Sequence, residues 1–184
     1  MRKVSALRIV YDGIVNSIET PVVISNIINN NSVKTKGLWD TGATASVITK
    51  DTAESLGIKP LGFRNVRGVH GVKQVNYYAV KITLNNENIT LEVEVTECES
   101  LSDGGETGML IGMDIITMGD FAVSNFDGKT VMTFRVPSIK RFDFVEEIRE
   151  NNKILSIHEA WLKQGNNKCP CGSGKLFKNC HGRE

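Results

Sequence analysis

The segment Trp39-Asp40-Thr41-Gly42-Ala43 decides how this sequence is interpreted. It places one carboxylate on a tight turn, next to a hydroxyl and a glycine and directly behind an apolar stretch. Splitting an amide by acid–base catalysis requires two carboxyls at one site, with one proton shared between them. The chain contains a single triplet of this kind, so the second carboxyl has to come from a second copy. The sequence therefore predicts a homodimer with Asp40 of each subunit at one site.

The residue types of this turn suit the hydrolysis of a peptide bond. Two Asp40 carboxyls at hydrogen-bonding distance cannot both ionise cheaply, so one keeps its proton and their titration belongs to the pair. The ionised carboxylate activates a water, and the protonated one donates to the scissile carbonyl. Gly42 permits a backbone approach that a Cβ would block, and Thr41 can hydrogen-bond across the dimer axis. We therefore predict Asp40, Thr41 and Gly42 as the catalytic residues.

The bulk composition fits one domain of ordinary size with an appendage, because 184 residues with 40% hydrophobic and 23% charged content can form a core and a polar surface. No stretch approaches the roughly 20 apolar residues that a membrane span requires. The N-terminal residues do not resemble a signal peptide. Three of the four cysteines lie within twelve residues, which in a chain without an export signal favours a metal site over disulfides and a cytoplasmic location.

The chain through Pro137 is predicted to be mostly β. Asp127-Gly128 predicts a hairpin that joins 121–125 to 130–136. Asp51 and Glu54 can form a capping box for a short helix that Gly57 ends, and a second short helix is expected from about Asp114 to Met118. Apolar segments of strand length recur at Ala6–Val10, Pro21–Ile24, Tyr77–Leu84, Ile89–Val95 and Val131–Val136.

The composition changes after residue 137. Residues 138–166 are predicted to form a linker of one or two amphipathic helices, and residues 167–184 a cysteine module. From Leu162 to Glu184 there are five basic residues and one acidic residue. This indicates either a tail with its own binding role or solvated lysines that keep a small appendage soluble, and charge alone favours the second interpretation.

Three segments resemble the retropepsin-like aspartic proteases, a family that includes the retroviral proteases and single-domain cellular and bacterial relatives. Leu38–Ile48 is similar to the family's active-site segment, and Met109–Ile116 to the apolar-apolar-Gly strand and following helix beneath the aspartate loop. Arg67–Val72 lies where the family has its flap, a glycine-rich hairpin over the substrate. The resemblance covers about Val4 to Val136 and implies a retropepsin-like β-barrel, the single-domain half of a pepsin-like fold.

The resemblance also assigns roles to residues outside the aspartate turn. Ile111 and Gly112 would support the active site. The flap would bind substrate through Gly68, Val69, His70 and Gly71. Three alternatives remain at this point: the turn is a plain loop, the fold is kept without activity as a dimeric peptide-binding adaptor, or Asp114 is a second acid instead of a cap or surface carboxylate. Unlike the retroviral proteases, the chain continues far past the helix after Gly112.

The cysteine module contains four candidate metal ligands, Cys169, Cys171, Cys180 and His181. Three thiols and a histidine form a closed tetrahedral set for zinc, and such sites are structural. Because so short a peptide has almost no core, metal binding supplies its folding energy. Cys98 lies far from this cluster and is expected to be a buried small hydrophobe.

The run Pro170-Cys171-Gly172-Ser173-Gly174-Lys175 closely resembles the SEC-C zinc motif, which ends the preprotein-translocase ATPase. The resemblance implies contact with a ribosome or a chaperone through Lys175, Phe177 and Lys178, whose alternative role is generic knuckle surface. The sequence thus predicts a cytoplasmic, homodimeric aspartic endopeptidase that hydrolyses extended protein segments, with a zinc knuckle that recruits a partner. Its rivals are the silent adaptor and a protein in which the knuckle is the main interaction module. We expect neither membrane insertion nor specific DNA binding.

Overall fold

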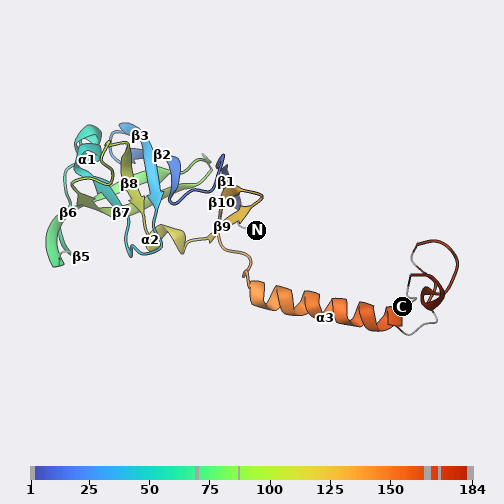
Figure 1. Ribbon diagram of the computed structural model, residues 1–184. Coiled ribbons are helices and arrows are strands. Elements are labelled where there is room, and N and C mark those ends of the chain that lie inside the picture. The colour runs from blue at the N-terminus through green and yellow to red at the C-terminus, as the bar shows by residue number, and fades with distance from the viewer. Residues whose placement is uncertain (1–2, 69–70, 87, 164–166, 170, 182–184) are drawn as a thin grey trace. The chain divides into compact units, whose positions relative to one another are not determined.

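The computed structural model describes residues 3–68, 71–86, 88–163, 167–169 and 171–181. The chain divides into two compact units, Met1–Lys140 and Arg141–Glu184, and each is described by itself. Figure 1 shows that the first unit is built mainly from strands and the second from one helix and a small module. None of the helices in the described ranges is long and apolar enough to cross a membrane.

The first unit is a closed β-barrel. Its strands follow the order β2-β3-β8-β4-β7-β6-β5, and β2 also pairs with β6, which closes six of them into a barrel and leaves β5 outside (Figure 1). This arrangement confirms the predicted mainly β fold. The strands span Ile18–Asn26 (β2), Ser32–Trp39 (β3), Val47–Thr49 (β4), Gly62–Gly68 (β5), Gly71–Thr83 (β6), Thr90–Cys98 (β7) and Thr107–Ile111 (β8).

The barrel core follows from the alternation along its strands. In β7 the apolar Leu91, Val93 and Val95 face inward while Glu92 and Glu94 are exposed, as the alternating pattern predicts. Side chains from β2, β4, β6 and β8 fill the same interior. Those with no exposed surface include Ile24, Ile48, Val80, Ile82, Met109 and Ile111.

A second, three-stranded sheet packs beside the strand that carries the aspartate turn. It has the order β1-β10-β9, formed by Ser5–Val10, Lys129–Val136 and Asp120–Phe126. The predicted hairpin is present, and Asp127 and Gly128 both have positive φ, as its two-residue turn requires. The ring of Phe121 stacks on Trp39 with centroids 5.3 Å apart.

Two short helices complete the first unit. α1 (Lys50–Leu56) is capped by the Thr49 side chain, which accepts a hydrogen bond from the amide of Thr52. The predicted capping box of Asp51 and Glu54 is therefore wrong, because the helix begins before Asp51. The predicted end at Gly57 is confirmed by its left-handed φ of 62°. α2 (Met113–Ile116) has Gly112 at its N-cap position.

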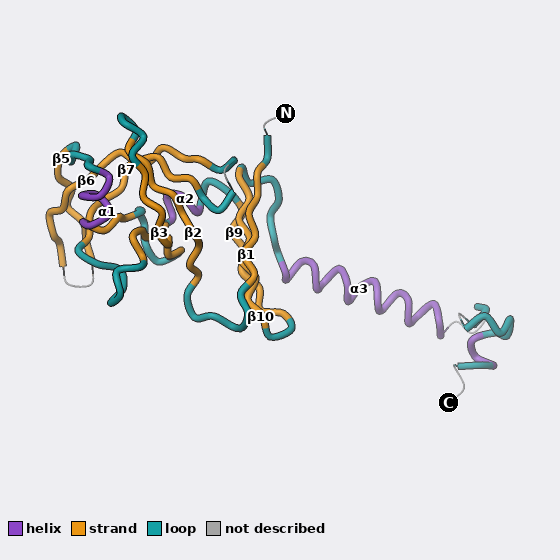
Figure 2. Tube along the Cα trace, turned by 90° about the horizontal axis from the view of Figure 1, so that it is seen from above, coloured by secondary structure: helices purple, strands orange, loops and turns teal. Residues whose placement is uncertain are grey.

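The second unit contains α3 (Phe144–Lys163) and the short 3-10 helix η1 (Phe177–Asn179). Figure 2 shows α3 as one unbroken helix. It begins after Asp143, whose Oδ1 accepts hydrogen bonds from the amides of Val145 and Glu146. Only a single helix forms where the sequence predicted one or two.

Candidate active site

Asp40 lies at the end of β3, where the strand is fixed to β8. Trp39 is the partner of Ile111 in the parallel ladder, and the amide of Asp40 donates to the carbonyl of Ile111 at 3.0 Å. The indole of Trp39 is buried and donates to Thr20 Oγ1 at 2.9 Å. The residue before the aspartate is therefore anchored in the core, while the Asp40 side chain remains half-buried at the barrel edge.

The turn after Asp40 brings a backbone amide to its carboxylate. Gly42 N donates to Asp40 Oδ1 at 2.8 Å, and Ala43 N donates to the Asp40 carbonyl at 3.3 Å. A Cβ on Gly42 would lie 3.1 Å from Asp40 Oδ1, closer than ordinary van der Waals contact, so glycine suits this approach. Thr41 and Gly42 are exposed, so the turn presents its carboxylate and hydroxyl outward.

The segment after β8 supports this turn from beneath. Met113 N donates to the carbonyl of Ala43 at 2.8 Å. A Cβ on Gly112 would lie 2.6 Å from the carbonyl carbon of Ala45, so only glycine fits without a backbone shift. Ile111 is fully buried. The contacts expected between the Ile-Gly segment and the aspartate loop are thus formed.

Asp114 makes a hydrogen-bonded pair with Ser46 across the two segments. Ser46 Oγ donates to Asp114 Oδ1 at 2.7 Å, and Ser46 N donates to Asp114 Oδ2 at 2.9 Å. Ser46 Oγ also accepts from Gly112 N at 3.0 Å. Because both Asp114 oxygens bind Ser46, this carboxylate ties the loop to α2 and is neither a plain surface residue nor aimed at the turn.

Sequence reasoning missed Ser46. Its hydroxyl lies 68 residues from the carboxylate that it binds, and Ser46 is fully buried. The available clue was a serine inside the first motif together with an acid at the start of the helix in the second motif, because a buried hydroxyl needs a hydrogen-bond partner.

The hairpin predicted to be the flap is formed by β5 and β6, which pair from Gly62–Tyr77 to Gly68–Gly71. The predicted flap residues Val69 and His70 lie outside the described residues. Arg64 forms an ion pair with Glu94, and its guanidinium lies 4.1 Å from the centroid of the Tyr77 ring. Phe63 and Val72 are 67% and 61% exposed, so the hairpin has apolar side chains on its surface.

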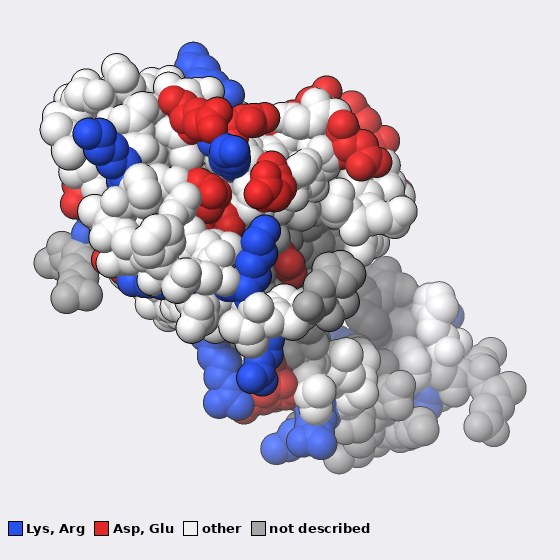
Figure 3. All heavy atoms as spheres, turned by 90° about the vertical axis from the view of Figure 1, so that its left-hand side faces the viewer, with Lys and Arg blue, Asp and Glu red and all other residues white. Residues whose placement is uncertain are grey.

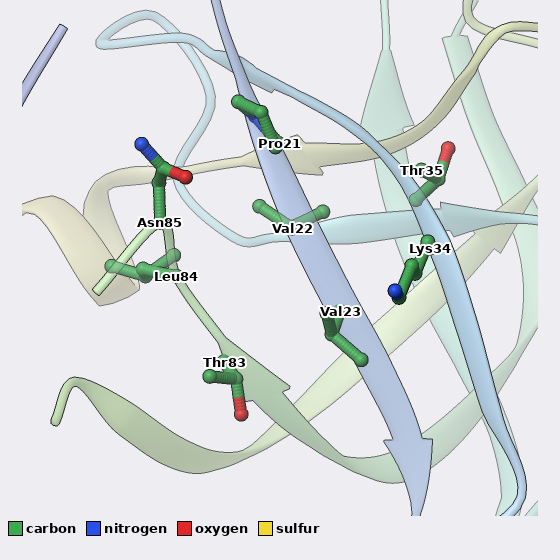
Figure 4. Close-up of a pocket in the computed structure, with 8 residues that line it drawn as sticks. All are labelled: Pro21, Val22, Val23, Lys34, Thr35, Thr83, Leu84 and Asn85. Carbon is green, nitrogen blue, oxygen red and sulfur yellow. The ribbon is translucent and has the colours of Figure 1, made fainter. Parts of the chain in front are cut away.

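A hollow of about 350 Å³ beside β2 is separate from the aspartate turn. Figure 4 shows its lining side chains, which come from β2, β3, the last residue of β6 and the two residues that follow β6. Lys34 is its only charged lining residue, and none of the lining residues is an acid, a histidine or a cysteine. On the face shown in Figure 3, acidic and basic side chains are interspersed. The hollow therefore supplies no second acid for Asp40.

The second unit brings the four predicted metal ligands together. The ligand atoms of Cys169, Cys171, Cys180 and His181 lie within 4.8 Å of one another. The two sulfurs of Cys171 and Cys180 are 3.6 Å apart, and His181 Nδ1 is 3.2 Å from Cys169 Sγ. A tetrahedral zinc with bonds of about 2.3 Å to sulfur would place its sulfurs about 3.8 Å apart. The cluster therefore fits a tetrahedral metal ion.

Local contacts favour the thiolate form that a metal requires. Hydrogen bonds from Ser173 lower the pKa of the Cys171 thiol to about 6. The turn between the ligands contains Gly172 and Gly174 with φ of 77° and 70°. Cys169 is buried, and its amide donates to the carbonyl of Lys175. Lys175 and Lys178 are exposed, and Phe177 is partly buried.

Residues 24–118 match the family described as "gag-polyprotein putative aspartyl protease", which is more than half of the chain. The chain belongs to this family. Its first unit is a retropepsin-like barrel, and residues 166–183 match the SEC-C motif. Both resemblances found in the sequence are thereby confirmed.

Solved structures similar to this chain include a retropepsin-like aspartic protease from Rickettsia conorii. It is 15% identical, and the match covers 74% of this chain and 98% of that one with a TM-score of 0.49. The retroviral protease-like domain of Ddi1 from Leishmania major is 19% identical and covers 70% and 100%, with a TM-score of 0.43. The EIAV protease complexed with the inhibitor HBY-793 is 20% identical and covers 55% and 86%, with a TM-score of 0.43.

A curated relative of the chain is the protein translocase subunit SecA of Ehrlichia chaffeensis. The two are 40% identical over 48 residues, which are 26% of this chain. The chain spans about 6% of the length of this relative.

Proposed function

We propose that this protein is a homodimeric aspartic endopeptidase in which each subunit contributes one Asp40. The observation that carries the proposal is the contrast between two carboxylates near the turn. Asp114 binds Ser46 through both oxygens. The Asp40 carboxylate is followed by an exposed turn, and within the described residues it accepts a hydrogen bond at Oδ1, from the Gly42 amide. One chain thus supplies half of an acid pair, and a second copy supplies the other half.

The reaction follows from this pair. The ionised Asp40 takes a proton from water, whose oxygen adds to the carbonyl carbon of the substrate. The protonated Asp40 of the other subunit gives its proton to the carbonyl oxygen. When the carbon–nitrogen bond breaks, the proton held by the first carboxyl passes to the leaving amine, and one hydroxyl of the diol returns its proton to the second carboxylate as the new carboxyl group forms. The amide of Gly42 holds one carboxylate oxygen in place during these steps.

The substrate in this proposal is an extended protein segment held between the flap hairpin and the aspartate turns. Gly68, Val69, His70 and Gly71 form the flap tip that covers it, and Ile111 and Gly112 keep the floor of the turn fixed. An extended peptide suits a site bordered by a hairpin, because its backbone can form main-chain hydrogen bonds there.

In the same proposal the second unit is a structural zinc knuckle that recruits a partner in the cytoplasm. The ligands are Cys169, Cys171, Cys180 and His181, and zinc supplies folding energy and no catalysis. Lys175, Phe177 and Lys178 would contact the partner, a ribosome or a chaperone. Their support is the exposure of both lysines beside the partly buried phenylalanine.

The test is peptide release from an unfolded protein substrate, followed by mass spectrometry from about pH 4 to pH 8, the range in which a carboxyl pair titrates. Asp40→Asn is compared with wild type and with Asp103→Asn, a control on an exposed loop. We expect cleavage by wild type and the control and none by Asp40→Asn. Unchanged cleavage by Asp40→Asn would overturn the mechanism, and no cleavage by a dimeric wild type would favour the adaptor.

A further inference from the structure

The hairpin of β5 and β6 leaves the barrel at Tyr77 (Figure 1). Tyr77 is the partner of Thr96 in β7 on one side and of Gly62 in β5 on the other. In the described strands, residues 78–83 of β6 pair with β7, whereas residues 71–76 pair with β5 alone. The position of the hairpin relative to the barrel is therefore set by the contacts around Tyr77.

A carboxylate from β7 holds Asn76, the first residue of β6 beyond the barrel. Asn76 Nδ2 donates to Oε1 and Oε2 of Glu97 at 3.2 and 3.3 Å. Because Tyr77 pairs with Thr96, Glu97 lies where the partner of Asn76 would lie if the antiparallel ladder continued by one residue. The Tyr78 hydroxyl also donates to Glu97 Oε2. Side-chain hydrogen bonds to Glu97 thus replace backbone pairing at the base of the hairpin.

This contact is shielded from water on one side. Tyr78 is 4% exposed, and Asn76 and Glu97 are half-buried. Burial and then the hydrogen bond to Glu97 raise the pKa of Tyr78 to about 12, so its hydroxyl stays protonated as a donor. Hydrogen bonds to a carboxylate are stronger than those between neutral groups. The donors on β6 are therefore held firmly to β7.

The opposite face of the hairpin has a contact of a different kind. Arg64 pairs with Glu94, and its guanidinium lies over the Tyr77 ring. The side chains of this ion pair are 45% and 51% exposed. Exposed ion pairs contribute little, because water and salt screen them. The half-buried contact of Glu97 is therefore the stronger link between the hairpin and the barrel.

The backbone of Glu97 is fixed to the strand that follows the aspartate turn. Glu97 is the partner of Ile48 in the parallel ladder of β4 and β7, and Ile48 is fully buried. β4 begins at Val47, directly after Ser46, whose hydroxyl binds Asp114. One residue thus joins the base of the hairpin, through its side chain, to the strand behind the aspartate turn, through its backbone.

We propose that Glu97 is a positioning residue that fixes the β5–β6 hairpin relative to the aspartate turn. The inference rests on the proposed function, in which this hairpin covers the substrate. Glu97 acts through Asn76 and takes no part in the bond-breaking steps. A hairpin held at its base loses less conformational freedom when a substrate binds. Loosening the base should therefore weaken substrate binding and leave the rate of bond breaking nearly unchanged.

The experiment exchanges the amide and the acid of this pair in the full, zinc-loaded chain. Asn76→Asp places two carboxylates against each other and breaks the contact. Asn76→Asp combined with Glu97→Gln restores it with donor and acceptor exchanged, and the new amide oxygen can still accept from Tyr78. This double variant also has the net charge of wild type. Asn88→Asp is the matched control, because it makes the same change on an exposed turn beyond the other end of β6.

The first readout is the steady-state cleavage of a synthetic peptide that contains a site cut in the unfolded protein substrate. We expect Asn76→Asp to raise KM about tenfold with kcat changed less than about twofold, and the double variant and Asn88→Asp to keep KM within about twofold of wild type. Damage to the fold alone would lower the amount of active enzyme, and hence kcat, without raising KM.

The second readout does not depend on catalysis. It is amide hydrogen exchange of residues 62–68 and 71–76, which should be about tenfold faster in Asn76→Asp and return to the wild-type rate in the double variant.

The outcomes separate this proposal from the peptidase. Wild-type KM in Asn76→Asp, whether or not hairpin exchange is faster, would rule out Glu97 as a positioning residue and leave the peptidase standing. A double variant as impaired as Asn76→Asp would do the same, since the effect would then come from the substitution itself. A wild type that cleaves nothing would overturn the peptidase, and hydrogen exchange would then decide alone whether Glu97 holds the hairpin.

Discussion

The two units of this chain bury their apolar side chains to very different degrees. The barrel buries side chains such as Ile24, Ile48 and Met109 completely. Among the described residues of the second unit, the buried hydrophobic is Cys169, which is a candidate metal ligand, while Phe144 and Leu155 stay exposed. The barrel is therefore stabilised by its own core, whereas the second unit, as we propose, depends on a bound metal ion.

This contrast predicts that metal removal separates the two units. Chelation should unfold residues 167–181, because metal binding contributes about 10–16 kcal/mol to knuckles of this kind. The barrel should keep its melting temperature, since its core contains no metal ligand. Nuclear magnetic resonance of both units before and after chelation measures this, and readdition of zinc is the control. Loss of barrel signals on chelation would contradict the contrast.

Within the barrel, Gly112→Ala tests how tightly the loop and its floor are packed. The new Cβ would meet the Ala45 backbone at 2.6 Å, so we expect the barrel to lose about 3 kcal/mol of unfolding free energy and its activity to fall. Urea denaturation measures the loss. Gly13→Ala is the control, because nothing lies within 4 Å of its new Cβ. Equal stability of the two variants would show that the loop is loosely held.

Ser46→Ala should have a smaller effect on the same region. It removes the hydroxyl that accepts from Gly112 N and donates to Asp114 Oδ1, and leaving buried polar groups unpaired costs about 2 kcal/mol. Thermal unfolding measures the change against Ser100→Ala, an exposed serine. A loss no larger than that of Ser100→Ala would show that the pair does not support the turn.

The smallest expected effect concerns pH and Asp120, near the end of the barrel unit. Hydrogen bonds from Ser138, the Ile139 amide and Arg135 hold the pKa of the Asp120 carboxyl well below its usual range. Because the folded pKa is depressed, this stabilisation is present above the unfolded pKa and is lost as the pH falls through the folded pKa. Asp120→Asn should thus lower the urea midpoint more at pH 7 than near pH 3, about one unit below the unfolded value. An equal difference at both pH values would contradict this account.

The sequence predicted the features that are coded locally. The strand alternation around Leu91–Val95, the hairpin turn at Asp127-Gly128 and the cluster of metal ligands each depend on residues close together in the chain. The family was also identifiable, because two motifs about seventy residues apart match it.

What the sequence did not predict depends on contacts between distant segments. The Ser46–Asp114 pair joins residues 68 positions apart, and no local pattern marks it. The N-cap of α1 is Thr49 and not the predicted Asp51, because Thr49 ends β4 and its hydroxyl accepts a hydrogen bond from the Thr52 amide. The approach of two Asp40 carboxyls depends in the same way on a distant contact, here one between two chains, so it stands as a proposal.

The central claim, that both subunits contribute Asp40 to one site, is tested most directly by mixing subunits. Wild type and Asp40→Asn are unfolded together, refolded with zinc at varied ratios and a constant total concentration, and assayed for peptide release. If each site needs two Asp40 carboxyls, activity follows the square of the wild-type fraction and falls to about one quarter at an equal mixture. A linear decline to about one half would show that each chain acts alone, and would contradict the account.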